Sequence, residues 1–186
     1  LRSTGVEAQE VSLALARRSV AGNGIADRCE VRLGDLRDPA ALPEGAVFDL
    51  VTGTPPYLPP GTGRESARVQ CGPCRIEHRG GIEDYCRTAA RLLAPGGWFV
   101  ACAGGAQAPR VRDAARGAGL VVARARDVVP RAGKPPLLAV HAMQRADDLL
   151  VGAPPMPEPQ PPLVVRDARG AWTGEFRALR RAMGMP

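Results

Sequence analysis

The hydrophobic and polar positions of the chain follow two alternating periods, which predict strands and helices in turn. A strand ends at Val6, and Glu7 stands at its tip. Residues 8–24 place apolar side chains among helix formers and close on Gly-Asn-Gly, a sequence typical of a helix C-terminus. Residues 29–35 alternate as a short strand. Residues 47–53 form a more continuously apolar strand, which we expect at the centre of a sheet.

The second half of the chain continues this alternation. A helix stopped by Pro-Gly-Gly, a strand, a second helix and two strands are expected at residues 82–97, 98–104, 108–120, 121–129 and 135–146. Strands that alternate with helices predict an α/β fold with a Rossmann-like, mostly parallel sheet. The last two strands are joined by a tight, Pro-rich connection and should form a C-terminal antiparallel hairpin.

The chain divides into three parts by composition. We assign residues 1–146 to the α/β core, residues 147–162 to a Pro-rich linker and residues 163–186 to a strand-turn-helix tail. Within the core, residues 59–80 form a loop that is long for a compact domain. A loop of that length predicts a binding segment.

Charge and cysteine content narrow the class of protein. Arginine supplies all but one of the 25 basic side chains, and the net charge is +6. This balance permits an RNA or DNA partner, although a high genomic GC content explains the arginines equally well. No apolar run reaches membrane-spanning length. Five cysteines in a chain of this length indicate a reducing, cytoplasmic compartment rather than a disulfide scaffold.

Three candidate site features follow the first three predicted strands. They are Glu7, Asp35 and the run Thr54-Pro55-Pro56-Tyr57. In open α/β sheets, ligands bind beyond the carboxyl ends of the strands. One carboxylate there can accept from two ribose hydroxyls, and a second can accept from an adenine amino group. Singly, the three features are explained as a turn acid, a helix cap and a strand terminator, but in this order they favour a ligand site.

The chain resembles the middle of class I S-adenosylmethionine-dependent methyltransferases in the stretches TGVEAQEVSLALARRSVAGNG, CEVRLGDLRD and FDLVTGTPPYLP. Within that class it is similar to the small-domain group that modifies exocyclic amines and amides. This group includes bacterial tRNA adenine-N6, rRNA guanine-N2 and release-factor glutamine methyltransferases, and its hallmark is Asn/Asp-Pro-Pro-Tyr/Phe after the fourth strand. LLAPGGWFVA resembles the fifth strand of the family, and VVPRAGKPPLLAV resembles the closing hairpin of the tRNA members. The resemblance spans Ser3 to about Arg145.

The resemblance implies S-adenosylmethionine as cofactor and methyl transfer to an exocyclic amine, with adenine N6 of tRNA or another RNA as first choice. Glu7 would bind the cofactor ribose, and Asp35 would bind its adenine amino group beside the Leu36 backbone. Residue 54 and the Pro55 carbonyl would accept hydrogen bonds from the target nitrogen. The implied site residues are Thr54, Pro55, Pro56 and Tyr57 for catalysis, Glu7, Asp35 and Leu36 for the cofactor, and Tyr57, His78, Arg79 and Lys134 for the substrate.

Two departures from the family pattern change the expectation. Position 54 is Thr, where the amine methyltransferases usually carry Asn or Asp, and a hydroxyl accepts more weakly than an amide or carboxylate oxygen. The first strand of the family and its Asp-x-Gly-x-Gly loop have no counterpart here. We therefore expect an N-terminally truncated methyltransferase, whose 186 residues bind the cofactor weakly or not at all. Micromolar binding would contradict this.

The sequence is also compatible with other functions. Within the same class, the chain would be a protein-glutamine or small-molecule methyltransferase, and outside it a non-catalytic remnant or binding protein. The stretch CGPCRIEHRGGIEDYC also offers Cys71, Cys74, His78 and Cys86 for zinc or redox chemistry. A second close ligand pair is missing, so unpaired thiols come first, a metal site second and a redox pair third, and we expect no metal. His141 is expected to be structural.

Overall fold

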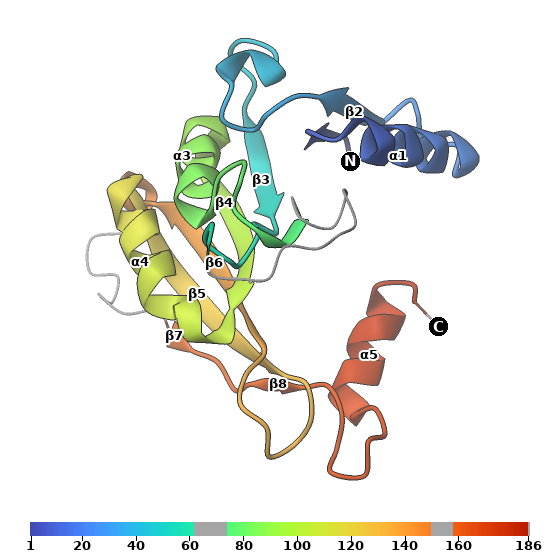
Figure 1. Ribbon diagram of the computed structural model, residues 1–186, viewed down its shortest axis with the longest axis vertical. Coiled ribbons are helices and arrows are strands. Elements are labelled where there is room, and N and C mark those ends of the chain that lie inside the picture. Colours follow the sequence, from blue (N-terminus) through green and yellow to red (C-terminus); the bar gives the residue numbers. More distant parts are fainter. Residues whose placement is uncertain (62–73, 150–157, 186) are drawn as a thin grey trace.

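The computed structural model describes residues 1–61, 74–149 and 158–185, and in these ranges the strands form two sheets (Figure 1). The smaller sheet pairs β1 (Ser3–Glu7) in parallel with β2 (Cys29–Leu33), and α1 (Glu10–Gly22) connects them. The larger sheet has the order β3-β4-β6-β5-β7, and β8 also pairs with β5. Its strands are β3 (Phe48–Gly53), β4 (Leu93–Gly104), β5 (Leu120–Val129), β6 (Leu138–Arg145), β7 (Glu158–Pro159) and β8 (Leu163–Val164).

The helices and strand directions agree with the predicted α/β class. The remaining helices are α3 (Ile82–Leu92), α4 (Ala108–Gly117) and α5 (Gly174–Ala182), with short 3-10 turns η1 (Pro39–Ala41), η2 (Gly105–Gln107) and η3 (Ala146–Asp148). β3 and β4 are parallel, whereas β6 runs antiparallel to both β4 and β5. The prediction of a Rossmann-like α/β fold with a C-terminal antiparallel hairpin is confirmed.

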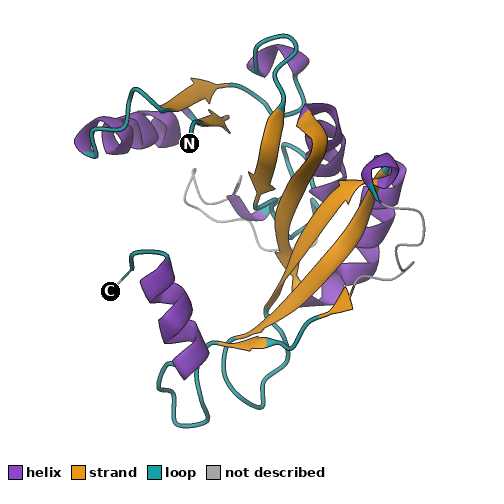
Figure 2. Ribbon diagram, turned by 180° about the vertical axis from the view of Figure 1, so that it is seen from behind, coloured by secondary structure: helices purple, strands orange, loops and turns teal. Residues whose placement is uncertain are grey.

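The hydrophobic core lies between the larger sheet and the α3–α4 pair, which Figures 1 and 2 show on one face of that sheet. β4 and β6 send alternate side chains into this layer, as expected for strands with one covered face. Phe99 and Met143 are essentially fully buried there. Val111 and Cys86 meet them from the two helices. The core therefore anchors β4 and α3, the elements nearest to the carboxyl end of β3.

The facing edges of β1 and β3 are unpaired within the described ranges. β1 hydrogen-bonds to β2 alone, and β3 to β4 alone, so the smaller sheet stands apart from the larger one (Figure 1). β3 is therefore an edge strand of the described sheet and not the central strand that its apolar sequence predicted. Val51 packs against the core, but Leu50 points to the opposite face and is 57% exposed, because helices cover this part of β3 on one face alone.

Boundaries differ from the predictions at two places. α3 ends at Leu92, so the Pro-Gly-Gly turn belongs to β4, whose register with β3 shifts there. A Cβ on Gly97 would lie 2.9 Å from the Ala94 oxygen and 3.1 Å from the Phe48 oxygen, which explains why glycine stands at this close approach. The Pro-rich linker is not purely a spacer, since β7 within it joins the sheet. Among the residues described here, no helix is long and apolar enough to cross a membrane.

His141 is a titratable side chain that is buried on the larger sheet. Its side chain on β6 is 2% exposed, and neither ring nitrogen has a hydrogen-bond partner among the described groups. Burial, with Arg112 nearby, lowers the pKa of His141, while Asp127 opposes this weakly. The folded state therefore keeps the ring neutral, whereas the unfolded chain binds a proton near the ordinary pKa of 6.5.

We expect the free energy of unfolding to fall as the pH drops below about 6.5, because protons bind preferentially to the unfolded chain. Urea denaturation at several pH values measures this. His141→Leu should flatten the pH dependence, because it removes the buried ring that titrates only in the unfolded chain. An unchanged slope in His141→Leu would show that other groups carry the acid sensitivity.

Candidate active site

A cavity of about 370 Å³ opens where the carboxyl ends of β1, β2 and β3 converge. Its size is within the range of small-molecule sites. It brings together three of the features that the sequence singled out at strand ends. The lining residues are Val6, Glu7, Ala8, Gln9, Gly34, Asp35, Leu36, Thr54, Pro56, Cys74, Arg79, Gly80 and Tyr85.

Glu7 is fixed by the turn that follows β1. Its Oε1 accepts the Gln9 backbone N–H at 2.8 Å, and its own backbone oxygen accepts the Gly34 N–H at 3.0 Å. The second bond ties the end of β1 to the end of β2. Glu7 thus presents a half-buried carboxylate at the cavity wall, with Oε2 free of any described hydrogen bond.

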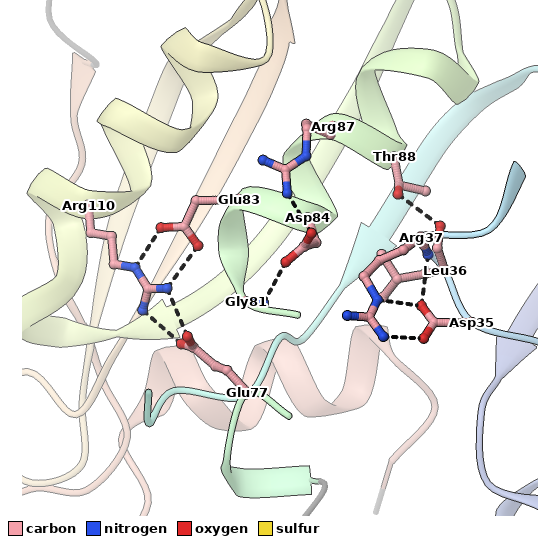
Figure 3. A network of polar contacts seen from close by, with 10 residues as sticks. All are labelled: Asp35, Leu36, Arg37, Glu77, Gly81, Glu83, Asp84, Arg87, Thr88 and Arg110. Atoms are coloured by element: carbon pink, nitrogen blue, oxygen red, sulfur yellow. Dashed lines mark hydrogen bonds and ion pairs between the residues drawn. The ribbon is translucent and has the colours of Figure 1, made fainter. Parts of the chain in front are cut away.

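Asp35 lies in the turn after β2 and is held by Arg37. Its Oδ1 accepts from the Arg37 backbone N–H and Nε, both at 2.9 Å, and its Oδ2 accepts from Nη2 at 2.6 Å. These hydrogen bonds lower the pKa of Asp35 and keep the carboxylate ionised. The neighbouring Leu36 oxygen accepts the Thr88 hydroxyl at 2.9 Å, which joins this turn to α3 (Figure 3).

The run after β3 divides between the cavity and the core. Thr54 is exposed and lines the cavity with Pro56, whereas Pro55 is fully buried. Tyr57 lies outside the cavity lining: burial and a hydrogen bond with Cys102 raise its phenol pKa, and its backbone oxygen accepts from Gln107 Nε2 at 2.8 Å. The structure therefore brings Thr54 and Pro56 to Glu7 and Asp35, but leaves the Tyr57 ring against β4.

Tyr85 is the aromatic residue of the cavity, and the sequence analysis missed it. It projects from α3, and burial followed by the charges of Glu7 and Asp35 raises its pKa. Its ring lies directly over Gly53, the last residue of β3: a Cβ there would be 2.5 Å from Tyr85 Cδ1. The sequence did contain a signal for this contact, because a glycine at the end of an otherwise apolar strand often marks a place where another group approaches the backbone closely.

We expect Gly53→Ala to destabilise the fold by about 1–3 kcal/mol, because the added methyl group overpacks against the Tyr85 ring. Thermal or urea unfolding measures the change. Gly22→Ala is the matched control, as nothing lies within 4 Å of its added Cβ. The cost should largely vanish in a Tyr85→Ala background. A cost that persists there would place the strain in the backbone.

The segment 74–81 forms another wall of the cavity, and Arg110 of α4 clamps it (Figure 3). The Arg110 guanidinium donates to both carboxylate oxygens of Glu77 at 2.7 and 2.8 Å, and to both of Glu83 at the same distances. These bonds lower the pKa of Glu83. Ile76 also forms a parallel bridge with Leu58. The wall is therefore fixed to the core at two points.

The substrate residues expected from the sequence lie apart from one another. Arg79 lines the cavity, and its Nη1 donates to the Ala8 oxygen at 2.8 Å, which spans the two sheets. His78 is exposed next to it but is not part of the cavity lining. Lys134 is exposed in the loop between β5 and β6. The structure thus places Arg79 with the strand-end residues and leaves Lys134 on a separate surface.

No family model matches the chain. Over 103 residues, the chain is 38% identical to the 4-amino-L-phenylalanine/4-methylamino-L-phenylalanine methyltransferase of Streptomyces pristinaespiralis. The aligned stretch covers 52% of this chain and 33% of that relative. The chain therefore spans about a third of the length of that curated relative.

Solved structures give a match over nearly the whole chain. A predicted O-methyltransferase from Agrobacterium tumefaciens superimposes with a TM-score of 0.68 at 19% identity, covering 98% of this chain and 78% of the other. The chain has the class I methyltransferase fold. An O-methyltransferase from neocarzinostatin biosynthesis, crystallised with S-adenosylmethionine and a naphthoic acid, matches with a TM-score of 0.51 at 17% identity, over 78% of this chain and 42% of that one.

Glu7 and Asp35 keep enough unused hydrogen-bond acceptor positions in this methyltransferase fold to bind a nucleoside. A carboxylate offers about four acceptor positions. The hydrogen bonds of the described residues use one acceptor position of Glu7, so this carboxylate can still bind two ribose hydroxyls. They use three on Asp35, which leaves one for an adenine amino group. These acceptor positions therefore fit the nucleoside half of S-adenosylmethionine.

The cysteine cluster is dispersed in the methyltransferase fold. Cys86 is fully buried in the core, where burial raises its pKa to about 12, whereas Cys74 is exposed at the cavity. Cys71 lies outside the described residues. In the described ranges, no three His, Cys, Asp or Glu side chains are placed to share a metal ion. Cys74 accepts a hydrogen bond from Gln9 Nε2 at 3.5 Å and is thus a cavity residue.

Proposed function

We propose that the protein is an S-adenosylmethionine-dependent methyltransferase that acts on an exocyclic aromatic amine. One observation carries the proposal: Thr54 and Pro56 at the end of β3 share a single cavity with Glu7 and Asp35. This arrangement puts the Thr54 hydroxyl, an acceptor for an amine, beside acceptors for a nucleoside. The curated relative, whose name gives an aromatic amine as its acceptor, supports the same reaction type.

The residues of the cavity need to bind and orient rather than react covalently. S-adenosylmethionine, when bound, supplies a methyl group on a positively charged sulfur. Glu7 and Asp35 would hold its ribose and adenine. Thr54 Oγ1 and the Pro55 carbonyl oxygen would accept the two N–H bonds of the amine, which withdraws the nitrogen lone pair from the ring and aims it at the methyl group. The methyl group would pass from sulfur to this nitrogen, and water, which reaches the exposed Thr54, would take the proton that the nitrogen loses.

For the acceptor we propose adenine N6 in tRNA or another RNA. The net charge of +6 supports a polyanionic substrate. Tyr85 supports a flat acceptor or cofactor base, because its ring lies at the cavity wall beside Thr54. A free arylamine is the second candidate, favoured by the substrate named for the relative.

Methyl transfer from labelled S-adenosylmethionine tests the proposal. The protein is incubated in parallel with bulk tRNA, with adenosine, with 4-amino-L-phenylalanine and with a glutamine-containing peptide. Label on N6 of adenine supports the first acceptor, and label on the arylamine supports the second. Label on a glutamine-containing peptide instead would overturn the aromatic-amine assignment. Cofactor binding without transfer to any of the four would favour a binding protein.

A further inference from the structure

Nearly all of the net positive charge of the chain is gathered in two segments. They are the loop 130–137 between β5 and β6, and the tail 163–186. Together they carry seven basic and two acidic side chains, a net charge of +5 out of the +6 of the whole chain. We refer to residues 130–137 and 163–186 as the basic surface. Outside these segments the other 18 arginines are nearly balanced by 17 acidic side chains, so it is the excess of positive charge, and not arginine itself, that is concentrated here.

The two segments form one continuous surface. The Ala132 backbone N–H donates to the Arg166 oxygen at 2.8 Å, and β8 continues the sheet beside β5. The Arg131 guanidinium lies close to Gly170, 3.4 Å from the position of a Cβ there. Figures 1 and 2 show the β5–β6 loop and the turn before α5 at the same end of the molecule. Cations that are 30 or more residues apart in sequence are therefore neighbours.

The basic side chains reach solvent, while the two acids are engaged. Asp167 Oδ1 accepts the Ala171 N–H at 3.0 Å, and Glu175 forms an ion pair with Arg126. Arg180 is half-buried and stacks 4.4 Å from the Trp172 ring centroid. The exposed cations are Arg131, Lys134, Arg166, Arg169, Arg177 and Arg181.

We propose that the basic surface binds the phosphate backbone of RNA. The inference rests on the proposed function, whose acceptor is an RNA base, and it assigns the contact with the rest of that RNA to a surface separate from the cavity. Guanidinium groups suit this role, because their planar donors match phosphate oxygens in pairs. These cations come from a loop, a turn and a helix, so they are distributed over an extended surface. Successive phosphates of an RNA backbone are distributed in the same way.

A membrane is the other polyanionic surface that a basic helix can contact. Helices that lie on membranes insert Trp and Phe side chains into the lipid. Here Trp172 and Phe176 pack on each other edge to face, with ring centroids 5.9 Å apart, and Arg166 and Arg180 both lie over Trp172. The aromatic groups of the tail thus stabilise the tail itself, which favours RNA.

The test compares two triple variants of the 186-residue chain with equal net charge. Arg169→Gln/Arg177→Gln/Arg181→Gln removes three cations of the basic surface. The matched control, Arg18→Gln/Arg28→Gln/Arg91→Gln, removes three exposed cations elsewhere. Binding to bulk tRNA is measured by fluorescence anisotropy over a series of salt concentrations. Binding to a DNA duplex of similar length, and cosedimentation with phosphatidylserine vesicles, are measured in parallel.

We expect the first variant to bind tRNA about tenfold more weakly at low salt, with a salt dependence shallower by about two counterions, while the control stays near wild type. Equal losses in both variants would overturn the proposal, because net charge alone would then explain binding. So would the absence of tRNA binding, tighter binding to the DNA duplex, or vesicle binding in its place. Methyl transfer to 4-amino-L-phenylalanine without tRNA binding would overturn this inference and leave the proposed aromatic-amine chemistry intact.

Discussion

Replacing Thr54 with valine is expected to lower the turnover number about 100-fold while changing the Michaelis constant little. Valine keeps the shape of the side chain and removes the oxygen that accepts the amine N–H. That hydrogen bond strengthens as the nitrogen leaves the plane of its ring, so its loss falls on the transition state. Removal of one donor from an oxyanion site gives a comparable loss, about 10²- to 10³-fold. Methyl transfer from labelled cofactor to bulk tRNA, with the full-length protein, provides the measurement.

Thr54→Asn is the companion variant, because it restores the residue usual in the amine methyltransferases that the chain resembles. We expect it to be as active as wild type or more active on adenine. Its amide oxygen accepts without having to orient a proton of its own. A fully active Thr54→Val together with an inactive Thr54→Asn would refute the clamp, and the two prolines would then shape a pocket for a different acceptor.

The second large effect is expected at Glu7. Glu7→Ala should weaken S-adenosylmethionine binding to the full-length protein by about tenfold to a hundredfold, since hydrogen bonds to a charged group contribute about 1.5–3 kcal/mol. Isothermal titration calorimetry measures the affinity directly. Glu10→Ala is the control: it removes an exposed carboxylate three residues away, in the first turn of α1, and should leave the cofactor affinity unchanged. Equal affinities for wild type and Glu7→Ala would return Glu7 to the role of a turn residue.

The parts of the site that the sequence predicted are those fixed by strand ends. Glu7, Asp35 and Thr54 each follow a parallel strand, and the carboxyl ends of such strands meet in space. Glu7 and Asp35 meet because β1 and β2 are parallel neighbours, whereas Thr54 reaches the same cavity from the separate larger sheet. Periodicity and turn residues also predicted α1 and the β5–β6 hairpin, with ends within three residues of those observed.

The parts that could not be predicted depend on contacts between distant segments. The Arg110–Glu77 pair joins residues 33 apart, and nothing in their local sequence specifies a partner. Tyr85 lies in the middle of a helix, where its spacing fits a core position as well as a cavity wall. The apolar period of residues 47–53 predicted a central strand, whereas β3 pairs with β4 alone in the described sheet, because such a period reports covered faces and not hydrogen-bonded neighbours.

The separation of β1 and β2 from the larger sheet has a consequence for hydrogen exchange. Leu13 is the one buried residue of α1, and it is still 7% exposed, while Val11 and Leu15 are each about half exposed. The amides of β1 and β2 should therefore exchange through a local opening of small free energy, whereas those of β4 and β6 should exchange at the rate of global unfolding. Since Glu7 and Thr54 lie on the two sides of this boundary, a ligand that binds both would slow exchange in the smaller sheet most. The protection of the Thr4 and Gly5 amides in β1 then reports occupancy of the cavity at residues outside its lining.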